Sequence, residues 1–390
     1  QALGAAGACA LAGCGPYPGP TPVKPVPSGW DRGEERWVLT TCGQCPAGCG
    51  VRARVYEGRA VGLQGNPVHP INEGGLGPKG HAALQLLYHP DRIQGPMRRV
   101  GARGEGRWQR ISWEEAIAET ARRLSDLRAA GGARSVAVLD GLPRGLMRDL
   151  WERFLTAFGS PNHVTHDSAL DGGDRLAMRY MQGASDLPAY DWENTGYVLG
   201  FGTSLFESWC QTLHLARGVA RMRQGRPGRR AKLVQVSPRF SVTAARSDEW
   251  IPIEPGTYGA LALGIAHVLV REKLFDEAFV RDHCFGFDPW TDEQGRAHEG
   301  FRELLARAYA PEAVAKVTGV EARTVERLAR EMAAHRPAIS VSDGGATSAS
   351  NGLPTAMAIH ALNALLGSLE RPGGIRVHRP AALAPWPAVA

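Results

Sequence analysis

The segment Lys232-Leu-Val-Gln-Val236-Ser237-Pro-Arg239 joins a short apolar run to a polar turn, and it indicates the fold class of the chain. An apolar run of this length that ends at turn-forming residues is typical of a buried β-strand. Helical patterns, at residues 146–158 and 320–334, separate this run from similar ones at residues 135–139, 196–201 and 338–342. The alternation predicts an α/β protein with mainly parallel sheets. Ligands of such sheets bind beyond the carboxyl ends of the strands, so we expect functional residues in the loops that follow them.

The segment Ser112-Trp-Glu-Glu115 has the sequence of a capping box, which predicts the start of a helix. In a capping box, the serine and the glutamate each accept a hydrogen bond from the other residue's backbone N–H group. Apolar residues recur at helical spacing after it, and Gly131-Gly132 ends the pattern. We therefore expect a helix between these two signals.

Length and composition are those of a globular protein. The chain has 390 residues, of which 43% are hydrophobic and 22% charged. A chain of this length is too long to fold around one ordinary hydrophobic core, so we expect two or three domains. The formal charge is +6, and the densest basic cluster, residues 226–230, is interpreted as a solvated turn. Since no basic run is interleaved with aromatic residues, we expect no nucleic-acid partner.

Three cysteines lie close together in Cys42-Gly-Gln-Cys45-Pro-Ala-Gly-Cys49. Thiolates at such spacings hold iron–sulfur clusters, and the small residues between them let the backbone fold tightly around a metal centre. A structural zinc site and buried thiols without a ligand are the alternatives. Zinc sites usually show a second pair of ligands, and neither His69 nor His81 belongs to one. The spacing therefore favours an iron–sulfur centre.

A second segment, Asn72-Glu-Gly-Gly-Leu-Gly77-Pro-Lys79-Gly80, resembles the N-x-G-x-L-C-x-K-G segment of the molybdopterin oxidoreductases of the dimethyl sulfoxide reductase family. In that family the cysteine is the fourth cluster ligand, and the lysine lies between cluster and pterin. The resemblance implies that Lys79 keeps its place, whereas Gly77 has no donor atom. Three outcomes remain open: a 3Fe–4S cluster on the three thiolates, a 4Fe–4S cluster completed by water or an outside ligand such as His81, and an empty loop.

The segments 237–244 and 248–261 resemble the family's D-P-R-x-T-x-T-A and A-D-x-W-L-P-I-R-P-G-T-D-x-A-L motifs. In the family, these loops hold the guanine dinucleotide ends of the pterin cofactor through two aspartates. Here Ser237 and Tyr258 replace the aspartates, and Glu254 replaces an arginine. A carboxylate beside a pyrophosphate repels it. The resemblance thus implies the family's fold without its molybdopterin guanine dinucleotide.

The metal-ligand segment shows a matching loss. Residues 158–162 and 166–170 resemble the family's F-G-S-P-N and H-x-S-x-C segments, in which the final cysteine coordinates molybdenum or tungsten. Leu170 stands at that cysteine and cannot bind a metal. Ser168 or a neighbouring aspartate would be the ligand in the alternative interpretation, in which the loop is shifted. Residues 344–352 and 362–374 also resemble family segments, and equally fit a capped helix that ends in a glycine turn.

The first fifteen residues are uncharged and rich in small residues, and Leu11-Ala-Gly-Cys14 matches the lipobox of bacterial lipoproteins. Acylation of Cys14 and a proline-rich tether predict an exported protein, anchored by lipid at the periplasmic face of the bacterial inner membrane. An apolar leader without this role is the alternative. Cys210 and Cys284 are isolated and are interpreted as buried single thiols.

These observations divide the chain into a small N-terminal cysteine-rich domain followed by α/β domains. The expected boundaries are a leader and tether (1–36), an iron–sulfur-type domain (37–95), a first α/β domain in two pieces (96–165 and 335–390) and an inserted α/β domain (166–334).

The chain lacks the fourth cluster cysteine, the metal-ligand cysteine and the guanine contacts together. In this combination it resembles the molybdopterin-like half of the iron–sulfur subunit of alternative complex III and of menaquinone reductase complexes. This resemblance implies a subunit of a membrane-bound quinol oxidoreductase, acting as a scaffold or at most as an iron–sulfur relay. The implied partners are cytochrome c-type, ferredoxin-like and integral membrane quinone-binding subunits. An active molybdenum or tungsten oxidoreductase of the polysulfide or thiosulfate reductase type is the main alternative, and an interaction module for an unrelated partner is a third hypothesis.

Overall fold

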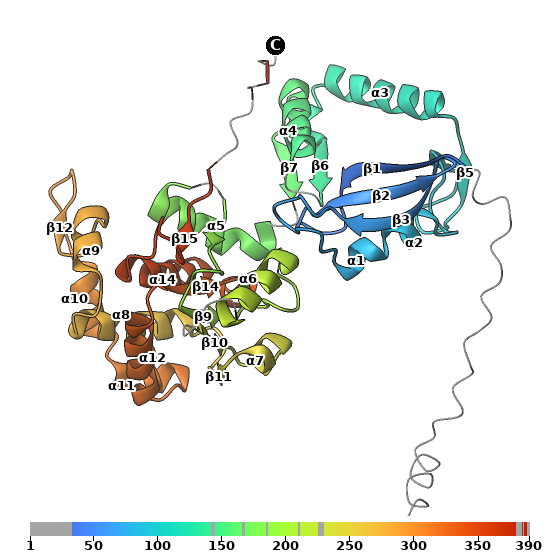
Figure 1. Ribbon diagram of the computed structural model, residues 1–390. Helices are drawn as coiled ribbons and strands as arrows, with labels where there is room; N and C mark the ends of the chain where they lie inside the picture. The colour runs from blue at the N-terminus through green and yellow to red at the C-terminus, as the bar shows by residue number, and fades with distance from the viewer. Residues whose placement is uncertain are drawn as a thin grey trace, which may run out of the picture.

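The computed structural model of the protein describes residues 33–141, 145–165, 168–184, 186–209, 211–224, 230–379, 384, 386 and 387, without the side chains of residues 168–171. The predicted lipidation site Cys14, the leader before Gly33, the side chain of Leu170 and the thiol of Cys210 therefore lie outside the described part. The described elements form a small antiparallel N-terminal unit and a larger α/β unit with a parallel sheet, which confirms the predicted fold class (Figure 1).

The N-terminal unit is an antiparallel sheet of order β1-β2-β3. Strands β1 (Glu35–Thr41) and β2 (Gly50–Tyr56) pair along their whole length, and Thr41 lies opposite Gly50 at the end of the ladder. Residues 42–49 therefore form the loop of a hairpin, and this loop contains the clustered cysteines. The unit is completed by β3 (Arg59–Gly65), α1 (Pro78–His81) and α2 (Ala83–Leu87).

A connecting region follows, and its helix begins as predicted. The side chain of Ser112 accepts a hydrogen bond from the Glu115 backbone nitrogen at 3.1 Å, and the Glu115 carboxylate accepts one from the Ser112 nitrogen at 2.9 Å. This capping box opens helix α3. The elements of this region are β4 (Met97–Arg99), β5 (Trp108–Arg110), α3 (Trp113–Ala129), the 3₁₀ turn Ala133–Ser135, β6 (Ala137–Asp140), α4 (Leu146–Phe158) and β7 (Asn162–Thr165), with β6 parallel to β7.

The larger unit is built on a parallel sheet of order β11-β10-β9-β14. Its strands are β9 (Tyr197–Phe201), β10 (Lys232–Val236), β11 (Glu249–Ile251) and β14 (Ala338–Ser342). The strands predicted at residues 196–201, 232–236 and 338–342 are thus confirmed. From β9 the chain adds β10 and β11 on one side and β14 on the other, so the direction of strand addition reverses between β9 and β14. We call this place the switch point.

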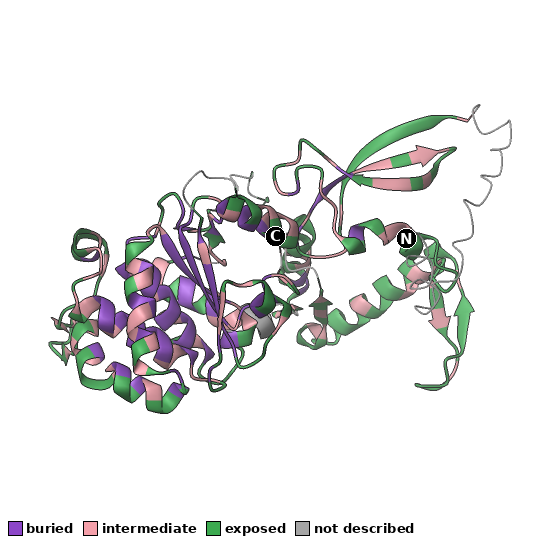
Figure 2. Cartoon of the chain, turned by 60° about the horizontal axis from the view of Figure 1, so that its bottom comes forward, coloured by how far each residue is buried: buried purple, intermediate pink, exposed green. Residues whose placement is uncertain are grey.

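Both faces of the sheet are buried, which explains why most residues of its strands are apolar. Alternate residues of β9 enter two separate cores: Tyr197, Leu199 and Phe201 pack into one core, and Val198 packs into the other. The first core is completed by α8 (Tyr258–Arg271), α12 (Ala322–Ala334) and α14 (Gly352–Leu365), and the second by α6 (Thr212–Gln224). Figure 2 shows that buried residues gather in this unit.

The remaining elements surround this core. They are α5 (Ser168–Gln182), β8 (Ala189–Tyr190), α7 (Val242–Arg246), α9 (Glu277–His283), β12 (Trp290–Thr291), β13 (Ala297–His298), α10 (Phe301–Ala308), α11 (Pro311–Thr318), α13 (Gly344–Thr347) and β15 (Ile375–Arg376). Among the helices that the structure describes, none is long and apolar enough to span a bilayer.

One predicted boundary differs from the observed strand pairing. The sequence division separates residues 335–390 from the inserted domain, yet β14 pairs with β9 from Ala338 opposite Tyr197 to Ser342 opposite Phe201. The reason is burial: Ile339 and Val341 are fully covered only because β14 joins a sheet that has helices on both faces. Residues 338–342 therefore belong with residues 197–201.

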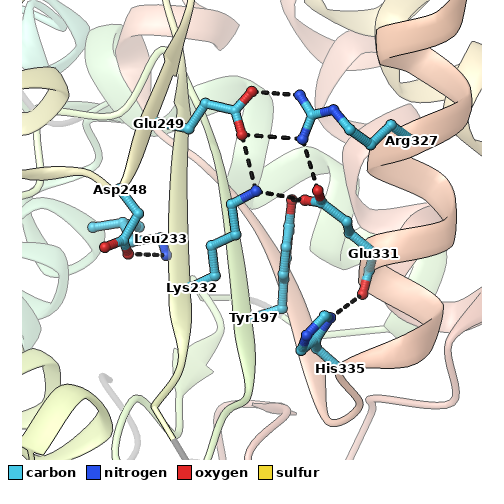
Figure 3. Close-up of polar contacts among 8 residues, drawn as sticks. All are labelled: Tyr197, Lys232, Leu233, Asp248, Glu249, Arg327, Glu331 and His335. Carbon is cyan, nitrogen blue, oxygen red and sulfur yellow. Dashed lines mark hydrogen bonds and ion pairs between the residues drawn. The ribbon is translucent and has the colours of Figure 1, made fainter.

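The amino ends of the strands carry a polar network that fixes α12 to the sheet (Figure 3). The ammonium of Lys232 lies 2.9 Å from Glu249 and 2.8 Å from Glu331, and Arg327 bonds both carboxylates. Tyr197 donates its hydroxyl to Glu331 at 2.9 Å. Burial raises the pKa of the Glu331 carboxyl, but hydrogen bonds from Lys232, Arg327 and Tyr197 outweigh burial and leave this pKa below its usual range. Each positive charge in this network is paired with a negative charge, so we infer that the network stabilises the fold. Ligands are therefore expected at the opposite, carboxyl ends of the strands.

His360 on α14 is expected to make stability depend on pH. It is 1% exposed, neither ring nitrogen has a hydrogen-bond partner among the described residues, and burial lowers its pKa to about 4. Between pH about 6.5 and about 4 the unfolded chain binds a proton that the folded chain rejects, so stability falls as the pH falls, by up to about 3 kcal/mol. Chemical denaturation across this range should show a flatter pH dependence for His360→Leu. A control variant at the exposed His89, His89→Gln, should keep the wild-type slope, and an unchanged slope in His360→Leu would contradict the prediction.

Candidate functional site

The three clustered cysteines lie in the hairpin loop between β1 and β2. The loop is closed where the Cys42 nitrogen donates to the Cys49 carbonyl oxygen at 2.8 Å. Cys49 is buried, whereas Cys42 and Cys45 are half-buried, and none of the three forms a disulfide. The fold thus brings all three predicted ligands together at one end of the N-terminal sheet.

The thiols interact with one another electrostatically. Burial raises the pKa of the Cys49 thiol, and the neighbouring Cys45 and Cys42 raise it further, because three thiolates in one loop repel. Iron would relieve this repulsion, since metal binding favours the deprotonated form. Within the described residues, no three His, Cys, Asp or Glu side chains converge on the position of a single metal ion. Cluster thiolates need no such convergence, because each one binds a different iron.

Asn72 joins the cysteine loop to the segment that contains Gly77. Its side chain is fully buried, and its amide oxygen accepts from the Gly50 nitrogen at 2.9 Å. Its amide nitrogen donates to the Gly50 carbonyl at 2.9 Å and to the Gly75 carbonyl at 2.6 Å. Gly50 directly follows Cys49. One amide group therefore sets the distance between the third cysteine and the place where the family has a fourth.

Gly77 precedes helix α1, with φ of −72° and ψ of 163°, a conformation that any residue adopts. A Cβ atom added here would meet no heavy atom within 4 Å. Neither backbone strain nor crowding requires glycine at this position. Lys79 is exposed on α1, and so is His81. The ring of His69 instead packs against the backbone of Gly50, and its buried Nδ1 has no hydrogen-bond partner among the residues described.

The segment after Asn72 also contacts the larger unit. Arg217 of α6 donates to the Asn72 carbonyl at 2.7 Å and lies 2.9 Å from the Glu73 carboxylate, and Arg221 lies 3.3 Å from the same carboxylate. Gly75 lies close to the side chain of Leu213. The cysteine loop is therefore tied, through Asn72 and Glu73, to a helix that covers the parallel sheet.

A cavity of about 510 Å³ lies at the carboxyl ends of β9 and β14, at the switch point. This is where ligands bind in open α/β sheets. The described residues that line it include no lysine or arginine, and His378 is its only basic side chain. Its acidic and aromatic side chains are Asp174, Asp186, Asp343, Tyr190, Trp192 and Trp209.

Asp174 of α5 lies at the base of this cavity and is 4% exposed. Its carboxyl group accepts hydrogen bonds from the Ser342 hydroxyl and, at 2.7 Å, from the Thr347 hydroxyl. Burial raises its pKa more than these two hydrogen bonds lower it. Asp174 thus favours the neutral form more than an exposed carboxyl does.

The positions that replace the family's guanine contacts are occupied by local interactions. Ser237 donates its hydroxyl to the Arg239 carbonyl at 2.7 Å, and its own carbonyl accepts from the Trp250 indole at 2.9 Å. Tyr258 begins α8 and is 4% exposed; burial, together with the negative charge of Asp343, raises its pKa to about 12. Glu254 is exposed. Ser237 and Tyr258 have no carboxylate with which to bind a guanine, and Glu254 has no positive charge with which to bind a pyrophosphate.

Comparison with known proteins identifies the family. The model of the molybdopterin oxidoreductase family matches residues 92–382, and that of the molybdopterin oxidoreductase Fe4S4 domain matches residues 35–89. The chain therefore belongs to the molybdopterin oxidoreductase family, as the motifs predicted. The match to the Fe4S4 domain supports an iron–sulfur cluster, and the match to the larger domain suggests a molybdopterin cofactor.

Among its relatives, the thiosulfate reductase molybdopterin-containing subunit of Salmonella typhimurium is 34% identical over 94% of this chain and 45% of that protein. The menaquinone reductase, molybdopterin-binding-like subunit of Nitratidesulfovibrio vulgaris is 34% identical over 88% of this chain and 46% of that protein. Acetylene hydratase from Pelobacter acetylenicus has a similar structure, with a TM-score of 0.71 and 26% identity, over 88% of this chain and 45% of that one. The chain spans less than half the length of these relatives.

Sequence reasoning located the cysteines but missed three residues that shape the two sites. Asn72 stands within the quoted family segment, where the amide residue that begins the N-x-G-x-L-C-x-K-G pattern was the available signal. Asp174 gave no signal, because its burial depends on the packing of α5 against α13 and α14. Asp343 follows a predicted strand directly, so the rule that ligands bind beyond strand ends would have pointed to it.

Proposed function

We propose that the chain is a non-catalytic subunit of a membrane-bound respiratory or photosynthetic quinol oxidoreductase complex, which lacks molybdopterin and acts as a scaffold or at most as an iron–sulfur relay. The switch-point cavity carries this proposal, because its described lining includes no lysine or arginine and contains Asp343, while Tyr258 is buried where the family has an aspartate. An anionic pyrophosphate needs cationic or N–H donors, and this lining does not fit it.

The relative from Nitratidesulfovibrio vulgaris supports this proposal, since its name describes a molybdopterin-binding-like subunit of a menaquinone reductase. By analogy, the proposed partners are cytochrome c-type, ferredoxin-like and integral membrane quinone-binding subunits. The proposed location is the periplasmic face of the inner membrane, with a lipid anchor on Cys14. Cys14→Ala should move the protein from the membrane fraction to the soluble fraction, and unchanged membrane attachment would contradict the anchor.

Metal analysis of the purified native protein tests the central claim. We expect molybdenum and tungsten far below one atom per chain. Stoichiometric molybdenum or tungsten would overturn the proposal and favour the alternative, an active oxidoreductase of the thiosulfate or polysulfide reductase type, which the relative from Salmonella typhimurium supports.

Iron is a separate measurement, because Cys42, Cys45 and Cys49 fit a cluster held by three protein ligands. When bound, such a cluster supplies one-electron transfer. We expect an electron paramagnetic resonance signal in the oxidised protein that disappears on reduction, as for a 3Fe–4S cluster. Iron far below stoichiometry in protein purified without oxygen would leave a scaffold without a relay.

A further inference from the structure

The loops that follow β9 and β14 touch one another at the switch point. A Cβ atom added to Gly202, which directly follows β9 and has φ of +62°, would lie 2.9 Å from the Ala346 nitrogen. One added to Gly345 would lie 2.1 Å from the Gly202 carbonyl oxygen. Glycine at both positions therefore permits direct backbone contact between the loops. In sheets of this topology, the crevice between these loops is where a ligand enters.

Asp343 holds the two loops together across this contact. One carboxylate oxygen accepts from the Ser204 nitrogen, in the loop after β9, at 2.7 Å. The other accepts from the Gly345 nitrogen, in the loop after β14, at 2.8 Å. Backbone N–H groups at the carboxyl ends of parallel strands are the donors that a phosphate group uses in such crevices. Here a side chain of the protein already occupies them.

The acidic residues of the cavity also disfavour the binding of a phosphate. Asp343 shares the lining with Asp174 and with Asp186, whose carboxylate is paired with Arg175. The lining residues that the structure describes include no lysine or arginine. A phosphate ester that entered would lose its hydration, meet a carboxylate at close range and find the nearest N–H donors in use.

We propose that Asp343 is a specificity-determining residue, whose carboxylate takes the place of a ligand phosphate between the loops after β9 and β14 and so excludes phosphate-bearing ligands. This inference rests on the proposed function, since it explains physically how the family's fold persists without a dinucleotide. It also predicts which ligands fit the cavity: those without phosphate and with a planar ring that can pack against Tyr190 and Trp209.

Calorimetric titration of the full chain with inorganic pyrophosphate and with GDP tests the exclusion. The variants are Asp343→Gly, which frees both N–H groups, and Asp343→Asn, which keeps an acceptor but removes the charge. Asp288→Asn is the matched control, because it removes an exposed carboxylate that does not line the cavity. We expect no binding at millimolar concentration in the wild type or the control, and pyrophosphate affinity at least about tenfold higher in Asp343→Gly.

Pyrophosphate bound equally by the wild type and by folded Asp343→Gly would overturn the inference, and so would a folded Asp343→Gly that does not bind. If Asp343→Gly fails to fold, Asp343→Asn provides the test. The inference requires this variant to bind pyrophosphate more tightly than the wild type does. Hydrogen exchange gives a readout independent of added ligand: the Ser204 amide should lose protection in Asp343→Gly and keep it in Asp288→Asn. Wild-type binding of GDP in protein free of molybdenum would overturn this inference alone, whereas stoichiometric molybdenum would overturn the proposed function.

Discussion

Gly77→Cys is expected to convert a three-iron cluster into a four-iron cluster. Three thiolates from Cys42, Cys45 and Cys49 hold three irons, and a fourth iron is lost most easily where no protein ligand binds it. A cysteine is compatible with this position, because φ is −72° and no heavy atom lies within 4 Å of the added Cβ. The Asn72 amide nitrogen donates hydrogen bonds both to the carbonyl of Gly75, two residues earlier, and to the carbonyl of Gly50. The new thiol would therefore begin close to the cysteine loop.

The measurement is electron paramagnetic resonance on oxidised and reduced samples, together with iron analysis. The wild type should show its signal when oxidised, and Gly77→Cys should show one only when reduced, with iron rising by about one third. Gly95→Cys is the matched control, since this glycine also has open space around it but lies outside the site, and it should behave as the wild type. An oxidised-state signal that persists unchanged in Gly77→Cys would show that residue 77 does not face the cluster.

Much of the fold could be predicted because the relevant signals are local. Lys232–Val236 is a strand in sequence and in structure, and Ser112 caps its helix as its spacing with Glu115 predicts. The position of β14 beside β9 was not predictable, because strand order depends on which helices cover each face. The same limit applies to the candidate site. Cys42, Cys45 and Cys49 are adjacent in sequence, whereas Asp343 and Ser204 meet only through the parallel pairing of their strands.

The proposed loss of ligand contacts is compatible with a stable fold at the positions inferred from the family resemblance. Tyr258 is buried at the start of α8 and contributes to the core. Ser237 closes its own turn through the Arg239 carbonyl. Ser237 thus has a hydrogen-bond partner within its own turn, and Tyr258 is buried in the core, so neither side chain needs a ligand for its contacts. Such exchanges are stable because the sheet and its helices supply the core, while the loops supply only specificity.

Asn72→Ala is expected to weaken the cysteine loop more than any other single polar substitution in the N-terminal unit. It removes three hydrogen bonds and leaves the Gly50 nitrogen without this partner in a buried position, whereas the Gly50 carbonyl still accepts from the Asn66 nitrogen at 2.9 Å. The cost is about 3 kcal/mol of local stability, because unsatisfied buried polar groups lose their hydration without compensation. The parallel sheet lies in a separate core, so far-ultraviolet circular dichroism should change little.

Iron content and hydrogen exchange at residues 42–50 measure this effect. Asn72→Ala should lose iron during purification and exchange its loop amides faster than the wild type. Asn72→Asp keeps the acceptor for the Gly50 nitrogen but loses both donated bonds and places a buried carboxylate against two carbonyl oxygens, so it should be at least as destabilised as Asn72→Ala. Asn351→Ala removes one exposed hydrogen bond to the Gly256 carbonyl and serves as the control, with a cost within about 0.5 kcal/mol. Wild-type iron content and exchange in Asn72→Ala would mean that the cysteine loop keeps its shape without the Asn72 amide.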